Sequence, residues 1–114
     1  MSASVDLTGA PAGVGPLWGM QSEELNATLL DWPPGGGVAE HVNDELEVIM
    51  LVLAGSAAVN LDGVEHHVAA GGLLLLPRGC ARSVSAGRDG VRYLSVHRRR
   101  GPLLPSPRAG LLDA

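Results

Sequence analysis

The sequence predicts one all-β domain, built as a sandwich or a barrel, on three observations. The 114 residues include 16 glycines and eight prolines, which is too many turn formers for a helical bundle. No long stretch repeats apolar residues with the 3.6-residue period of an amphipathic helix. Instead, about eight short apolar segments recur between turn signals, as strands do in small β-domains. These segments are residues 27–32, 38–43, 47–54, 57–61, 64–69, 73–77, 81–86 and 91–98.

The strand segments occupy the middle of the chain, so we expect one folded body at residues 17–100, a usual size for a domain. Residues 1–16 are small, rich in Pro and Gly and without periodicity, and we expect a flexible segment there, loose or wrapped across a partner. Residues 101–114 are interrupted by three prolines and are expected to form a C-terminal tail.

Composition and charge exclude several classes of partner. The formal net charge of −4 argues against nucleic acid, and no run of about 18 apolar residues is present to span a membrane as a helix. The single cysteine and the lack of a signal-peptide pattern in the first twenty residues predict a cytoplasmic protein. All eight arginines lie in residues 78–114 and ten of the acids in residues 1–77. We interpret the basic run at residues 97–100 as a solvated strand end, with an anion-binding site as the alternative.

Asp62 and Gly63 predict the one turn that can be specified in detail. They separate two apolar segments, and Asp-Gly is a type I′ hairpin signal because both residues tolerate positive φ. The two-residue loop fixes the strand register, which places His66 on an apolar face and His67 on a polar one. We therefore expect His66 at the edge of the core and His67 on the surface.

The four leucines at residues 73–76 predict a strand that is buried on both faces, with a second subunit covering one of them. Small domains gain stability by dimerisation, so we expect a homodimer. Cys80 follows in a loop close to Arg82. We favour a small buried structural cysteine over a thiol made reactive by that arginine.

The first of two motifs carries most of the functional information. It consists of Gly35, His41, Asn43, Glu47 and Gly55. This pattern resembles the first motif of the cupin superfamily, in which a second histidine stands at the position of Asn43. Counting back from Gly55 by the family interval lands on Val48, so Glu47 is one residue out of register. A β-bulge just before it would absorb the slip.

The second motif lies about twenty residues further on. It consists of Gly71, Pro77, Gly79 and Arg82. It resembles the second cupin motif, with Arg82 in place of a histidine. On the two motifs in this order the chain is identified as a member of the cupin superfamily, similar to small stand-alone bacterial cupins. The resemblance implies a double-stranded β-helix, which is a jelly-roll barrel.

The resemblance also implies where a site would lie. In metal-binding cupins three histidines and one glutamate converge inside the barrel, and here those positions hold His41, Asn43, Glu47 and Arg82. Asn is a weak ligand and Arg repels a divalent cation. We therefore expect a small polar or anionic ligand and no tightly held metal. Arg82 then either clamps a carboxylate or phosphate, or pairs with Glu47 or Glu45.

Strand alternation extends this set of residues. On the last strand segment Tyr93 and His97 share a face, so both join Asn43, Glu45 and Arg82 as candidate ligand-binding residues. The sequence leaves open whether His97 faces the lumen or the solvent.

A metal-dependent enzyme, such as a dioxygenase or an isomerase, is the alternative. An inward His97 would join His41 and Glu47 in a set able to hold iron, manganese, nickel, copper or zinc. Without a metal, His41 and Glu47 are the candidate catalytic acid–base pair for proton transfer. A third interpretation is a regulatory module that acts through its surface. Whether the chain is catalytic stays open at this point.

Overall fold

The computed structural model describes residues 4–99, and in this part of the chain all regular structure is β-strand. It therefore contains no helix that could cross a membrane. The all-β prediction is confirmed. The strands are β1 (Gly15–Gln21), β2 (Leu25–Trp32), β3 (Gly37–Val42), β4 (Val48–Leu61), β5 (Val64–Ala69), β6 (Leu73–Leu76) and β7 (Ala81–Arg98).

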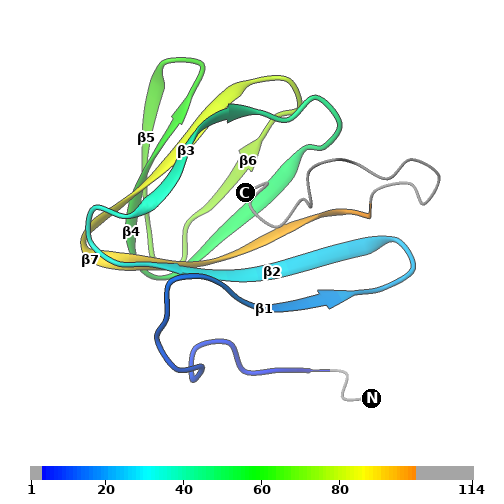
Figure 1. Ribbon diagram of the computed structural model, residues 1–114, viewed down its shortest axis with the longest axis vertical. Helices are drawn as coiled ribbons and strands as arrows, with labels where there is room; N and C mark the ends of the chain where they lie inside the picture. Colours follow the sequence, from blue (N-terminus) through cyan, green and yellow to red (C-terminus); the bar gives the residue numbers. More distant parts are fainter. Residues whose placement is uncertain (1–3, 100–114) are drawn as a thin grey trace.

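Two long strands, β4 and β7, bend midway and thereby connect all the others (Figure 1). Their ladder shifts register between Val52 and Ala54 and again between Gly55 and Ala57. At this corner Gly55 and Gly90 have φ values of 71° and 75°. A Cβ atom on Gly55 would collide with the carbonyl oxygen of Gly90, so only glycine allows the two strands to cross this closely.

The bends divide the strands into two facing sheets. One sheet has the order β1-β2-β7-β4-β6 and uses the C-terminal half of β7 with the N-terminal half of β4. The other has the order β3-β7-β4-β5 and uses the remaining halves. All these pairs are antiparallel, and the arrangement is the double-stranded β-helix expected from the resemblance.

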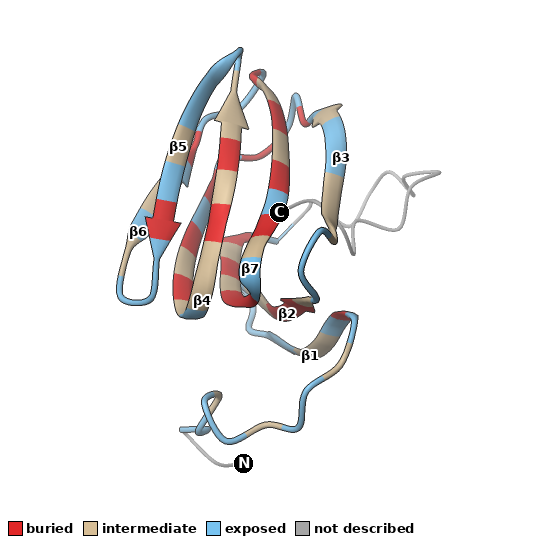
Figure 2. Cartoon of the chain, turned by 90° about the vertical axis from the view of Figure 1, so that its left-hand side faces the viewer, coloured by how far each residue is buried: buried red, intermediate tan, exposed pale blue. Residues whose placement is uncertain are grey.

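The core lies between the two sheets. Burial alternates along β4 and β7, because only one face of each strand points inward (Figure 2). Removing this apolar surface from water is the main favourable term for folding, at about 25 cal/mol for each Å². The inner residues are Leu30, Val48, Met50, Val52, Ala57, Val59, Val68, Leu76, Val84, Ala86, Val91 and Tyr93.

The Asp62-Gly63 hairpin is confirmed in turn and in register. The two residues have φ values of 49° and 86°, and β4 pairs with β5 as the two-residue loop requires. His66 is half-buried and His67 is exposed, as expected. Cys80 is buried, and its thiol donates to the carbonyl oxygen of Pro77 at 3.1 Å.

The strand boundaries differ from the sequence prediction in two respects. The segments on either side of Gly55 form one strand, β4, and those on either side of residues 87–90 form β7, because the corners bend these strands without ending them. In addition, β1 lies where no strand was expected, and it begins at Gly15. The expected tail at residues 101–114 lies outside the described residues.

In the single chain residues 73–76 are buried on one face only, and the expected cover of the other face by a second subunit stays a prediction. Leu76 points into the core and is fully buried, whereas Leu73 is 63% exposed and Leu75 is 48% exposed. The reason is that β6 belongs to an antiparallel sheet, of which only the inner face packs against the second sheet. Four consecutive leucines thus form a one-sided strand with an apolar outer face.

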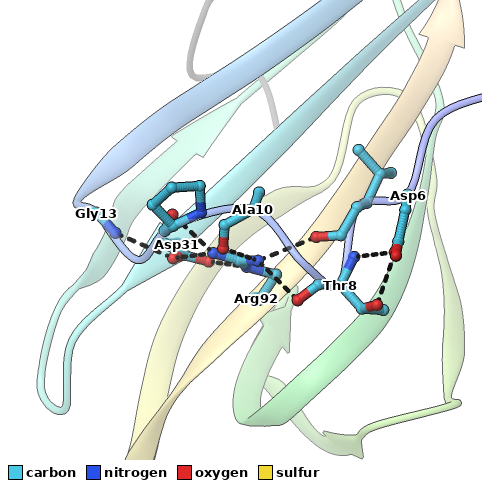
Figure 3. A network of polar contacts seen from close by, with 8 residues as sticks. Asp6, Thr8, Ala10, Gly13, Asp31 and Arg92 are labelled. Carbon is cyan, nitrogen blue, oxygen red and sulfur yellow. Dashed lines mark hydrogen bonds and ion pairs between the residues drawn. The ribbon is translucent and has the colours of Figure 1, made fainter.

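Arg92 fastens the N-terminal segment to the barrel (Figure 3). Its guanidinium donates to both carboxylate oxygens of Asp31, at 2.7 and 2.8 Å. It also donates to the carbonyl oxygens of Leu7 at 3.0 Å, Ala10 at 2.8 Å and Pro11 at 3.1 Å. The hydrogen bond from Arg92 holds the pKa of Asp31 below its usual value. This part of the chain therefore lies against its own barrel, whereas the sequence suggested a segment that is loose or wrapped across a partner.

Candidate ligand-binding site

Strand pairing sets His41 directly opposite Arg82. β3 runs antiparallel to the first half of β7, and these two residues are partners in the ladder. Opposed residues share one face of a sheet, with Cβ atoms roughly 5 Å apart. Arg82 is completely buried and has the same parity as Val84 and Ala86 of the core. Its side chain therefore projects into the barrel from the same face as His41.

The Arg82 guanidinium reaches toward the opposite sheet. Its Nη1 donates to the carbonyl oxygen of Leu76 in β6 at 3.4 Å. Burial lowers the pKa of Arg82, because the apolar interior disfavours the charged form. Arginine nevertheless stays protonated at neutral pH. The barrel thus holds a permanent positive charge whose burial costs folding free energy.

His41 has one ring nitrogen fixed by its own strand and one directed into buried space. Nδ1 donates to the carbonyl oxygen of Ala39 at 2.9 Å, so the neutral ring carries its proton there. Nε2 is buried and has no hydrogen-bond partner in the described structure. It can accept a hydrogen bond from a ligand, or donate one when the ring is protonated.

Asn43, like His41, has one polar side-chain atom fixed by the protein and another that is buried without a partner in the described structure. Its Oδ1 accepts from the backbone N–H groups of Glu45 at 2.9 Å and Leu46 at 3.0 Å, which fixes the orientation of the amide. The other end, Nδ2, is buried and has no partner among the described residues. A buried donor left without a partner costs about 1–3 kcal/mol, which a ligand or an ordered water would recover.

The inner face of the last strand adds Tyr93 and His97. The Tyr93 hydroxyl accepts from the indole N–H of Trp32 at 3.2 Å, and burial raises the pKa of Tyr93 to about 12. His97 is buried with the parity of Tyr93, so it faces inward. Its Nδ1 lies 2.7 Å from the carbonyl oxygen of Arg98, and its Nε2 lies 3.3 Å from the amide nitrogen of Asn26. Both ring nitrogens of His97 are therefore engaged by the protein.

Asn26 was not among the site residues predicted from the sequence. The only signal for it is the pairing of β2 with β7, which sets it opposite His97. That register depends on strand pairing and is not visible in the sequence.

Glu47 lies outside the barrel. Val48 takes the inward position at the start of β4 and is fully buried, whereas Glu47 is exposed. The predicted bulge is replaced by the turn that Asn43 organises before β4. Counting back from Gly55 by the spacing of the cupin motif reaches Val48, and Val48 is indeed the residue that points inward. The Glu45 side chain is likewise exposed, whereas Arg82 is completely buried.

The described donor set does not fit a metal centre of the cupin type. Between residues 4 and 99 no group of three or more His, Cys, Asp or Glu side chains is placed to hold a metal ion. The structure thus does not bring His41, Glu47 and His97 together. Because Glu47 lies outside the barrel, it does not form the expected acid–base pair with His41.

A hollow of about 440 Å³ lies away from these residues, beside the N-terminal segment. Arg92 forms part of its wall, but the guanidinium is engaged by Asp31 and by backbone carbonyls. We therefore place the candidate site in the barrel interior, where buried polar atoms still have hydrogen-bonding capacity.

A family model for the AraC-like ligand-binding domain matches residues 28–104, which include both motifs and the buried polar residues above. The chain belongs to this family. The AraC-like ligand-binding domain is cupin-like, so membership agrees with the observed barrel and with the cupin resemblance of the sequence.

A curated relative of this AraC-like domain is protein SchB of Streptomyces halstedii. The two are 34% identical over 80 residues, which are 70% of this chain. The match covers 56% of SchB, so the chain spans little more than half the length of that relative.

Solved structures share the fold of this AraC-like domain. A conserved Klebsiella pneumoniae protein with a double-stranded β-helix domain has a TM-score of 0.73 and 18% identity, covering 86% of this chain and 90% of its own. The cupin domain of Schizosaccharomyces pombe Cnp3 has a TM-score of 0.71 and 16% identity, with coverage of 86% and 74%. KdgF from a Halomonas species has a TM-score of 0.67 and 19% identity, with coverage of 75% and 78%.

Proposed function

We propose that the chain binds a small polar or anionic molecule inside the barrel, with Arg82 as the positive centre of the site. The observation that carries this proposal is the buried side chain of Arg82, paired in the ladder with His41, together with two buried polar atoms, Nε2 of His41 and Nδ2 of Asn43, that have no partners in the described structure. Membership of a ligand-binding family supports it.

Charge and hydrogen bonding favour a carboxylate or a phosphate as the group bound. A guanidinium offers parallel N–H donors that match two oxygens of such a group, and hydrogen bonds between charged partners are the stronger ones. The amide of Asn43 adds a neutral donor, and His41 adds either an acceptor or a cationic donor. The hydroxyl of Tyr93, whose pKa burial raises to about 12, is protonated at neutral pH as tyrosine ordinarily is, and we include it as a further ligand contact.

The remaining lining of the interior is apolar, with Met50, Leu76 and Val84 among the core residues. We therefore propose ligands in which one acidic group is joined to a small apolar body. A catalytic role is not part of the proposal, because Glu47 lies outside the barrel and does not supply a base to His41. The cytoplasmic location and the exclusion of nucleic acid stay predictions.

A thermal-shift panel tests the proposal and searches for the ligand. The panel contains acetate, butyrate, benzoate and inorganic phosphate, each compared with chloride at matched ionic strength. A ligand present at about 100 times its Kd stabilises the native state by about 2.7 kcal/mol, which raises Tm by about 10 °C or more in a domain of this size. We expect at least one acid to raise Tm in the parent and not in an Arg82→Met variant. If no acid exceeds the chloride control, or if both proteins respond alike, the proposed site is wrong.

A further inference from the structure

The inner wall formed by β2 and β7 carries two hydroxyl groups side by side. Thr28 and Ser95 are partners in the ladder that joins these strands (Figure 1). Thr28 has the same parity as the core residue Leu30 and therefore points inward. Ser95 has the parity of Tyr93, which also belongs to the core, and points inward as well. Residues opposed in this way have Cβ atoms roughly 5 Å apart, so one ligand group can reach both hydroxyls.

These two hydroxyls have hydrogen-bonding capacity that the protein does not use. Ser95 is only 3% exposed and Thr28 is half-buried. Neither hydroxyl forms a hydrogen bond with another residue between 4 and 99, whereas Asn26 and His97 in the neighbouring row lie 3.3 Å from each other. Buried polar groups normally have partners. An inward hydroxyl pair without one therefore marks a place where a ligand group or an ordered water binds.

The hydroxyl pair lies one row further along the sheet than the point that Arg82 reaches. The Arg82 guanidinium donates to the carbonyl oxygen of Leu76 at 3.4 Å. Ser95 pairs with Met50, and Met50 pairs with Leu74, which is two residues from Leu76 in β6. Two residues of a strand span roughly 7 Å. A ligand that binds Arg82 through its acidic group can therefore reach the hydroxyl pair with a second polar group about that far away.

We propose that Thr28 and Ser95 form a second subsite, which binds a hydroxyl group of the ligand, so that the chain prefers hydroxy acids to plain acids. This inference rests on the proposed function, because it places the acidic group at Arg82. Each protein hydroxyl both donates and accepts, so the pair can accept from a ligand hydroxyl and donate to it at the same time. Met50 and Leu74 lie in the same row, pack in or against the core and offer an apolar wall to the carbon skeleton.

Matched pairs of acids test the subsite. Calorimetric titration compares benzoate with 4-hydroxybenzoate and butyrate with 4-hydroxybutyrate, which differ by one hydroxyl group at the end away from the acid. We expect at least one hydroxy acid to bind the parent about 5–10-fold more tightly than its plain counterpart, as a net gain in hydrogen bonding allows. In the double variant Thr28→Val, Ser95→Ala this preference should disappear, while the plain acid binds within about twofold of its parent affinity.

Ser85→Ala is the matched control and should leave the preference unchanged. Ser85 lies on the same strand as Ser95, but it is exposed and has the parity opposite to the core residues Val84 and Ala86. Circular dichroism and Tm establish that each variant is folded. A general loss of structure would weaken both members of each acid pair, whereas loss of the subsite removes only the difference between them.

The outcomes separate this proposal from the one on which it rests. If the acids bind through Arg82 and neither hydroxy acid is preferred, the subsite is wrong and the proposed function stands. The same conclusion follows if the preference survives in the folded double variant, since the two hydroxyls would then hold only an ordered water. If none of the four acids binds the parent, or if Arg82→Met binds them equally well, both proposals fail together.

Discussion

Replacing Arg82 with methionine is expected to abolish anion binding while leaving the barrel folded. Methionine fills a similar volume and has no charge, so the binding group is removed without opening a large cavity. Loss of two charge-assisted hydrogen bonds should weaken binding of the selected acid by about 100-fold or more. Calorimetric titration measures this loss directly.

The same variant should keep most of its stability. Burial disfavours the charged form of Arg82, as its lowered pKa indicates, so removing the charge relieves a cost of folding, whereas the hydrogen bond to Leu76 is lost. We expect the free energy of unfolding to change by no more than about 1–2 kcal/mol, measured by urea denaturation. The exposed Arg88, replaced by methionine, is the matched control and should change neither property. An Arg82→Met protein that loses several kcal/mol and still binds the acid would show that Arg82 is structural.

Replacing Arg92 with alanine is expected to destabilise the domain by about 3–5 kcal/mol, because the nearly buried Asp31 carboxylate would lose its partner. The N-terminal segment would also lose the donors that hold Leu7, Ala10 and Pro11. Arg92→Lys should retain only a part of the stability that Arg92 provides, since an ammonium group cannot make the bidentate contact with Asp31. Urea denaturation gives the free energy, and limited proteolysis reports the release of the segment. A variant as stable as the parent would contradict this role.

The same ion pair predicts a pH dependence with a definite sign. The pKa of Asp31 is lowered in the folded state from the usual value of an aspartate carboxyl group, mainly by the hydrogen bond from Arg92. Its contribution to stability is therefore fully present above that value and is lost as the pH falls below it through the folded pKa. The parent should lose this part of its stability in acid, and the Arg92→Ala variant should not show that loss.

Local signals in the sequence predicted those parts of the fold that depend on local conformation. Asp62 and Gly63 determine a turn through their positive φ values, and that turn determines the register of β4 and β5. The cupin resemblance placed His41 and Arg82 at corresponding points of two motifs, and the ladder pairs them. Alternation placed Tyr93 and His97 on one face of their strand, but only the structure shows that this face points inward.

Other features depend on contacts between distant segments and could not be predicted. The sequence does not show whether Glu47 or Val48 points into the barrel at the start of β4. The reason is that a turn without regular strand pairing separates β3 from β4. The four leucines of β6 have no alternation from which to infer an open face. Arg92 binds the N-terminal segment, which lies more than 80 residues away in the sequence, and no local sequence pattern predicts that contact.

Calorimetric titration of tag-free, chelator-treated protein with the acid that gives the largest thermal shift tests the ligand site most directly. Because Arg82 is proposed as the positive centre, we expect one site for each chain and the same affinity before chelation, after chelation and after adding back iron, manganese, nickel, copper or zinc. Binding that disappears on chelation and returns with about one metal ion for each chain would contradict the proposal and favour the metal-dependent alternative.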